Sequence, residues 1–524
     1  MAHFESELDD SVGTGWVRPH AARLWVRSAK AGRLRVRLLD SNGQLLDEGT
    51  FDPPTDEALD GTATFRWPDD VDGATTALEP AHTYDYEVFR EPDALLGRGR
   101  LLTPPLGWDD CPERFAIAVA SCHQPFGDDG SASTKARRLV EKVHEVLDSH
   151  DVKAVVLCGD QVYNDQPAAL SLFDDEYFAQ VAPPGRSSIL ECTREEVRAL
   201  VQDRYRAFWG LDGFQRLQSR WACYPIPDDH DLVDNFGSAP EHASETWRAF
   251  REGALDACHD YQTSRVLGRH GDRPESLHHS FAWGPLRVFT MDLRSEKTSD
   301  GEVCSIYSDH QLAEVERFLH GNEDAGLLAL VLSVPIAHIP EWLSAIGKPL
   351  EGEGGDLADR WGQPAARRSR DRLMALLHEH RERRPWQPLV LLGGDVHMGA
   401  VSELRWADGA ASIHQLISSP LTNDEAAVFQ HGSALAHEAL QTIDGEGYPR
   451  CDVRLLPGTA ALERNPVPAL NVGIVEVSVR EGRCFFRLQL LALNDEGEPV
   501  LVYESAELPG PMGGGPEARG DYTD

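Results

Sequence analysis

From residue 115 onward, short apolar runs alternate with segments of helical periodicity. The runs 115–120 and 154–158 flank a segment whose apolar residues, from Ala136 to Leu147, recur at i, i+3 and i+4. Further apolar runs lie at 222–226, 286–291, 327–332, 389–392 and 413–417. This alternation predicts an α/β fold with helices on the faces of a sheet.

The first hundred residues have a different pattern. Short β-rich runs are separated by turn residues such as Ser41, Asn42 and Gly43. The runs lie at 23–26, 33–39, 63–67, 83–89 and 98–102. Strands this short and this closely spaced predict an N-terminal β-sandwich over 1–108, followed by the α/β domain over 113–508. Residues 509–524 hold five glycines and three prolines, and we expect them to be disordered.

The chain carries a large acid excess. It has 50 Lys and Arg against 86 Asp and Glu, a formal net charge of −36. Such a charge opposes non-specific binding of nucleic acid or of an anionic membrane. It also repels anionic small molecules, so a site for one of them needs a local cation.

The cysteine pattern and the hydropathy of the chain indicate its cellular compartment. The nine cysteines are widely spaced and form no CxxC pair, which argues against a disulfide framework or a zinc ribbon. The most apolar stretch, 326–337, is shorter than the roughly 20 residues of a membrane helix. Residues 1–17 contain no Lys or Arg, so no secretory n-region is visible. We therefore expect a cytoplasmic protein with no membrane span.

Residues able to bind a metal follow four of the predicted strands. One of these segments alone is weak evidence, because Gly-Asp is common at turns, acidic loops are common in this chain, and a lone cysteine is usually a small buried hydrophobe. In an open α/β sheet, however, ligands bind beyond the carboxyl ends of the strands. Because all four segments lie at predicted strand ends, together they predict a metal site. The segments are Ser121-Cys122-His123, Gly159-Asp160-Gln161-Val162-Tyr163, Asp228-Asp229-His230-Asp231 and Gly394-Asp395-Val396-His397.

These motifs, with Ser419-Pro420 after the strand 413–417 and Met291-Asp292-x-Arg294, resemble those of the alkaline phosphatase D family. That family belongs to the calcineurin-like metallophosphoesterases and is related to the purple acid phosphatases. The resemblance implies a four-layer αββα sandwich as the catalytic domain. It also implies a fibronectin-like module at the N-terminus, because the segments 23–27 and 84–86 resemble that module of the family.

The resemblance also implies a ligand set for two metal ions, in which Asp160 bridges. Thiolate, phenolate and imidazole suit iron or zinc at the first site, and carboxylates suit calcium, manganese or magnesium at the second. The first site would take Cys122, Tyr163 and His397, and the second Asp229 and Asp395. His338 is a further candidate ligand, and His123 is expected to be structural.

The implied activity is hydrolysis of a small phosphate monoester or diester by a metal-activated hydroxide. His230 would act as the general acid, and Arg294 would bind phosphate oxygens, unless it forms an ordinary salt bridge. Loops 183–188 and 351–364 could cover the site. The alternative is a non-catalytic metal-binding scaffold or interaction protein, although none of the six proposed ligands is replaced by an apolar residue.

Overall fold

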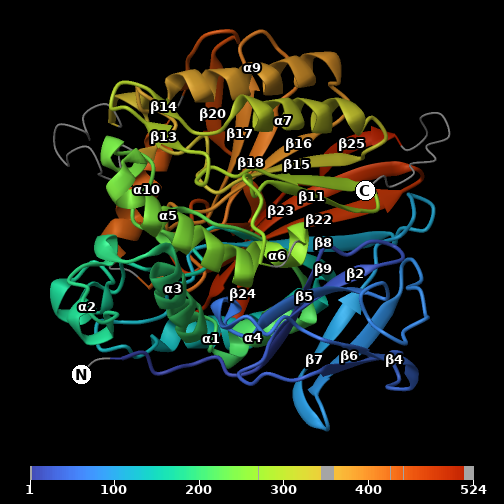
Figure 1. Cartoon of the computed structure of the whole chain (residues 1–524). Coiled ribbons are helices and arrows are strands. Elements are labelled where there is room, and N and C mark those ends of the chain that lie inside the picture. The colour runs from blue at the N-terminus through green and yellow to red at the C-terminus, as the bar shows by residue number, and fades with distance from the viewer. Residues whose placement is uncertain (1–2, 269–270, 344–358, 425–426, 441, 513–524) are drawn as a thin grey trace.

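Two large mixed sheets form the centre of the protein (Figure 1). The computed structural model describes residues 3–268, 271–343, 359–424, 427–440 and 442–512. The first sheet contains, in spatial order, β21 (Gly458–Glu463), β24 (Pro499–Ser505), β23 (Arg483–Leu493), β22 (Asn471–Arg480), β8 (Arg114–Ala120), β9 (Val152–Cys158), β10 (Ala222–Ile226), β1 (Ser11–Gly15), β2 (Ala22–Arg27) and β5 (Thr62–Trp67), with β25 (Leu508–Met512) paired to β23.

The second large sheet lies across a shared core from the first. It contains, in spatial order, β11 (His279–Trp283), β12 (Leu286–Thr290), β15 (Leu327–Leu332), β16 (Leu389–Gly393), β18 (Ile413–Ile417), β17 (Ala400–Trp406), β20 (Cys451–Leu455) and β19 (Thr442–Ile443). Strands β8, β9 and β10 are parallel, and so are β12, β15, β16 and β18. Their carboxyl ends carry the predicted motifs.

Helices cover the outer faces of both sheets, and in Figure 1 α7 and α9 lie above them and α1, α3 and α4 below. The described helices are α1 (Thr134–Ser149), α2 (Asp175–Val181), α3 (Arg194–Phe208), α4 (Asp212–Arg220), α5 (Glu245–Cys258), α6 (Ser264–Leu267), α7 (Asp309–Gly321), α9 (Arg367–Arg383) and α10 (Ala427–Ala439). Among the described residues no helix has the length and apolarity to cross a membrane.

The burial pattern of the strands explains this layering. On β8, Ile117 and Val119 belong to the buried cluster between the sheets that includes Val331 of β15, whereas Ala118 belongs to the cluster that includes Leu139 of α1. Because successive side chains of a strand point to opposite faces, a strand buried on both faces is apolar throughout. The mixed α/β architecture predicted from the alternation is confirmed.

The N-terminal strands form two sheets. Strands β1, β2 and β5 extend the first large sheet, where Thr14 of β1 pairs with Ala222 of β10. The second sheet contains β4 (Leu45–Phe51), β3 (Leu34–Leu39), β6 (Thr83–Arg90) and β7 (Ala94–Leu102). The hydrogen-bonded sheet thus runs across the predicted boundary near residue 108, and β1 covers an edge of β10 that would otherwise be open.

The C-terminal prediction is partly wrong. Within 509–524, expected to be disordered, the first residues belong to β25 and pair with β23, as Phe485 with Pro509 and Arg483 with Met512. The free edge of β23 offers backbone partners that composition does not reveal. Residues 513–524 lie outside the described part of the chain.

Candidate metal centre

Four of the predicted ligands have a left-handed backbone. Cys122, Asp160, Asp395 and His397 have φ values of 56°, 53°, 62° and 52°. Non-glycine residues rarely adopt this conformation, and it costs of order 1 kcal/mol or more per residue. Each lies two to four residues after the end of a strand. Such clustering of strained residues is typical of a functional site.

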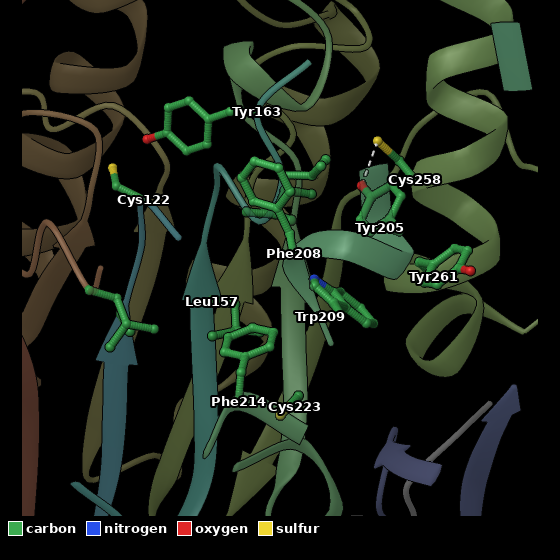
Figure 2. Close-up of a cluster of buried hydrophobic side chains, with 14 of the residues drawn as sticks. Cys122, Leu157, Tyr163, Tyr205, Phe208, Trp209, Phe214, Cys223, Cys258 and Tyr261 are labelled. Carbon is green, nitrogen blue, oxygen red and sulfur yellow. Dashed lines mark hydrogen bonds between the residues drawn. The ribbon is translucent and has the colours of Figure 1, made fainter. Parts of the chain in front are cut away.

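Asp160 joins the two parts of the predicted site. Its Oδ2 lies 3.4 Å from the Cys122 sulfur and 3.4 Å from the Tyr163 hydroxyl oxygen, and its Oδ1 accepts from the His230 amide at 3.2 Å. Figure 2 shows the Cys122 thiol and the Tyr163 hydroxyl near each other, at one side of the buried cluster that also contains Phe208. One carboxylate therefore reaches both sets of predicted ligands.

Four carboxylates meet at the second part of the site. Asp160, Asp228, Asp229 and Asp395 each offer an oxygen, and these oxygens lie within 4.8 Å of one another. Burial, and then the charge of Asp229, raise the pKa of Asp160 well above its ordinary value. Burial also raises the pKa of Asp228 to about 6. Mutual repulsion of this kind is relieved by a bound cation.

The unpaired atoms of this cluster fit a metal ion. Asp228 Oδ2 and Asp229 Oδ1 are buried and have no hydrogen-bond partner, although Arg294 lies 3.5 Å from the latter. Buried carboxylate oxygens without partners are costly, and oxygen-rich sites are those that calcium, magnesium or manganese prefer. The thiol and phenol beside Asp160 add the softer donors that iron or zinc accept. The residues present therefore fit a pair of metal ions.

Asp231 holds two of the ligand loops together. Its carboxylate accepts from the backbone amides of Asp160 at 2.9 Å, Gln161 at 3.2 Å and Asp228 at 2.8 Å. The Gln262 side chain donates to it at 2.7 Å. Although these bonds favour the charged form, burial raises the pKa of Asp231 to about 7. Asp231 thus sets the spacing between the loops after β9 and β10.

The His230 ring is held from two sides. Its Nδ1 lies 2.8 Å from an Asp165 oxygen, and its Nε2 lies 3.7 Å from an Asp234 oxygen. The ring stacks on Tyr163 with centroids 4.2 Å apart. Burial alone would lower the pKa of His230, but Asp165 and the site carboxylates raise it well above its ordinary value. A histidine can transfer protons when a carboxylate orients its ring and the histidine lies beside a metal site.

Arg294 is placed differently from the phosphate-binding role suggested by the sequence. It has no exposed surface, and its guanidinium donates to Asp228, to the Phe236 carbonyl at 3.2 Å and to both Asp359 oxygens at 3.0 and 2.6 Å. Each nitrogen of the Arg294 guanidinium fork therefore already donates a hydrogen bond. The buried carboxylates of Asp228 and Asp359 need a charge partner, and Arg294 supplies it. Arg294 therefore holds the carboxylate cluster in position from its buried side.

The last motif reaches the site through Ser419. The His397 amide donates to Ser419 Oγ at 3.1 Å, and that hydroxyl lies 3.1 Å from the Cys122 sulfur. The backbone of His397 is thus connected to Cys122 through one hydroxyl group.

Two other histidines lie away from the carboxylates. His338 lies against α10, with Nε2 3.4 Å from Ser433 Oγ and its ring 5.9 Å from that of His437. Neither carboxylate cluster found among the described residues includes it. His123 contacts Thr422 at 2.9 Å and the Phe208 carbonyl at 2.8 Å, as expected for a structural residue.

Four residues of the site were not assigned from the sequence. Asp228 and Asp231 lie inside a quoted motif and Asp165 follows Tyr163 by two residues, so their closeness in sequence to assigned residues was the available signal. Arg360, whose guanidinium pairs with Asp395, stands alone in the loop 351–364 and had no signal. Residues 351–358 of that loop lie outside the described residues.

Comparison with known proteins agrees with the geometry. A family model described as PhoD-like phosphatase matches residues 117–453. The chain belongs to the PhoD-like phosphatase family.

Its structure is similar to that of PhoD, with a TM-score of 0.63 at 16% identity over 97% of this chain and 90% of the other. It also resembles purple acid phosphatase PPD1 from yellow lupin (Lupinus luteus) seeds, with a TM-score of 0.53 at 10% identity over 96% and 74%. A comparison with curated proteins finds no match.

The family match and the two structural likenesses confirm that the chain is related to the family that its motifs resemble. At these identities the two solved structures establish a shared fold and nothing finer. Phosphoester hydrolysis in general follows from membership of the family.

Proposed function

We propose that this chain is a two-metal hydrolase of small phosphate monoesters or diesters. The observation that carries the proposal is the double contact of Asp160, which lies against Cys122 and Tyr163 on one side and belongs to the carboxylate cluster on the other. A bridging carboxylate is what a pair of metal ions requires.

The proposed ligands divide at Asp160. Cys122, Tyr163 and His397 would hold iron or zinc with it, and Asp229 and Asp395 would hold calcium, manganese or magnesium. When bound, the metal pair would supply Lewis acidity and lower the pKa of water from about 15.7 to about 7. Asp228, whose Oδ2 has no hydrogen-bond partner, is a further candidate for the second ion.

His230 is proposed as the general acid. Its Nδ1–H donates to Asp165, which fixes the ring and leaves Nε2 to carry the transferable proton. As the bond between phosphorus and the leaving oxygen breaks, Nε2–H gives its proton to that oxygen, and the ring becomes neutral. Asp165 acts through His230 and is therefore a positioning residue.

The finer description of the fold is also a proposal. We assign the strands of 113–508 in the two facing sheets, with their outer helices, to the four-layer metallophosphoesterase sandwich. We assign the strands of 1–108, three of which extend the first of these sheets, to a fibronectin-like module. All nine cysteines are unpaired, which supports a reducing, cytoplasmic setting.

Metal analysis with esterase assays tests the proposal. Purified protein should contain about two metal ions per chain. It should also cleave an aryl phosphate or a bis-aryl phosphate, and the ratio of the two rates separates a monoesterase from a diesterase. A non-catalytic scaffold would bind metal and cleave neither, and that result would favour the alternative function.

A further inference from the structure

The substrate of the proposed reaction is an anion, and the chain carries a net charge of −36. A phosphate ester must therefore find a local cation besides the metal ions. Two buried basic residues beside the cluster are already committed. Arg294 uses every nitrogen of its fork, and Lys297 donates to Asp359 and, at 2.9 Å, to Ser238.

Arg360 differs from both of these. In the part of the chain described here, its guanidinium pairs with one residue, Asp395, and through one nitrogen. Its side chain keeps 13% of its surface exposed, whereas Arg294 keeps none. Within the described residues, the other nitrogens of its fork make no hydrogen bond.

The backbone around Arg360 is anchored on both sides. Asp359 pairs with Arg294 and Lys297 in the buried interior. Trp361 is 2% exposed, and its indole N–H donates to the Val334 carbonyl at 2.9 Å. Because its two neighbours are fixed, the Arg360 side chain is presented to the cluster with little freedom to leave it. Such support from rigid neighbours is what a substrate-positioning group needs.

We propose that Arg360 binds the non-bridging oxygens of the substrate phosphate. The inference rests on the proposed function, because it requires a phosphate at the carboxylate cluster. A planar guanidinium fork matches two phosphate oxygens at once, which a lysine cannot do. Arg360 takes the role that the sequence suggested for Arg294, and Arg294 holds the segment that carries it through Asp359.

Phosphate binding by the metal-loaded protein tests this assignment. Calorimetric titration with inorganic phosphate would compare the wild type with Arg360→Gln, Arg360→Lys and the matched control Arg372→Gln, whose arginine pairs with exposed Asp309. We expect Arg360→Gln to raise the Kd for phosphate about tenfold or more, since it removes a charged hydrogen-bonding pair. Arg360→Lys should lose less, and Arg372→Gln should match the wild type.

Metal content and kinetics complete the test. Arg360→Gln should keep its metal ions and raise KM for an aryl phosphate more than it lowers kcat. Unchanged phosphate affinity in fully metal-loaded Arg360→Gln would overturn the proposal. Loss of metal in step with loss of phosphate would also overturn it, because Arg360 would then act by holding Asp395. A wild type that binds phosphate but cleaves no ester would instead refute the proposed function.

Discussion

The carboxylate of Asp231 accepts a hydrogen bond from the backbone amide of Asp160 at 2.9 Å. The same carboxylate accepts from the Asp228 amide at 2.8 Å, so one side chain sets the distance between two ligand loops. The left-handed conformation of Asp160 is held in place partly by this bond.

Asp231→Asn should therefore weaken both the fold and the metal site. The new amide group would face backbone donors and leave at least one of them unpaired, at a cost of about 1–3 kcal/mol. Urea unfolding measures this loss, and elemental analysis should find less metal per chain. Exposed Asp175, in the first turn of α2, provides the control variant Asp175→Asn. Full metal content in a destabilised Asp231→Asn would show that the loops keep their spacing without it.

His230→Ala should lower kcat by about 10²–10⁴ for an alkyl phosphate. An aryl phosphate should lose much less, because its leaving group departs without a proton. Asp165→Asn should show the same substrate pattern with a smaller loss. Steady-state kinetics with both substrates, beside metal analysis, separates the roles. If His230→Ala lost metal but kept its turnover per metal, His230 would be a ligand and not the acid.

Arg294→Gln should destabilise the protein strongly, since it leaves buried Asp228 and Asp359 without their cation. Breaking a buried pair in this way costs about 3–5 kcal/mol. The expected result is a lower thermal midpoint, with a fall in activity that follows the fraction of folded protein. A variant of wild-type stability with a raised KM would instead support the phosphate-binding role predicted from the sequence.

Sequence reasoning succeeded where one strand or one motif contains its own signal. The strands ending at Ala120, Cys158 and Ile226 are apolar apart from Arg114 and Lys153 near their starts, because both faces are buried, and the motif residues follow them directly. It could not decide an outcome that depends on partners far away in the chain. The fork of Arg294 is shared by Asp228, the Phe236 carbonyl and Asp359, which is 65 residues away, and no local pattern predicts that. The pairing of β25 with β23 depends on a distant partner in the same way.

Acid should destabilise the protein through buried neutral histidines. Burial lowers the pKa of His279 to about 4, against 6.5 in the unfolded chain. Between these values the unfolded state binds a proton that the folded state does not, so stability falls as pH drops from about 6.5 toward 4. His279→Asn keeps a donor for the Leu277 carbonyl and should remove about 1.5 kcal/mol of the loss between pH 6.5 and 5. Identical pH dependence in urea unfolding of the two proteins would contradict this account.

Metal content in two carboxylate variants tests the central claim most directly. If Asp160 joins two metal ions, elemental analysis should find about two per chain in the wild type. Asp160→Asn should lose both together with the esterase activity, whereas Asp395→Asn should lose the second ion and keep the one beside Cys122 and Tyr163. Esterase activity in wild-type protein that contains no metal would contradict the account, and so would an Asp160→Asn variant that retains both ions.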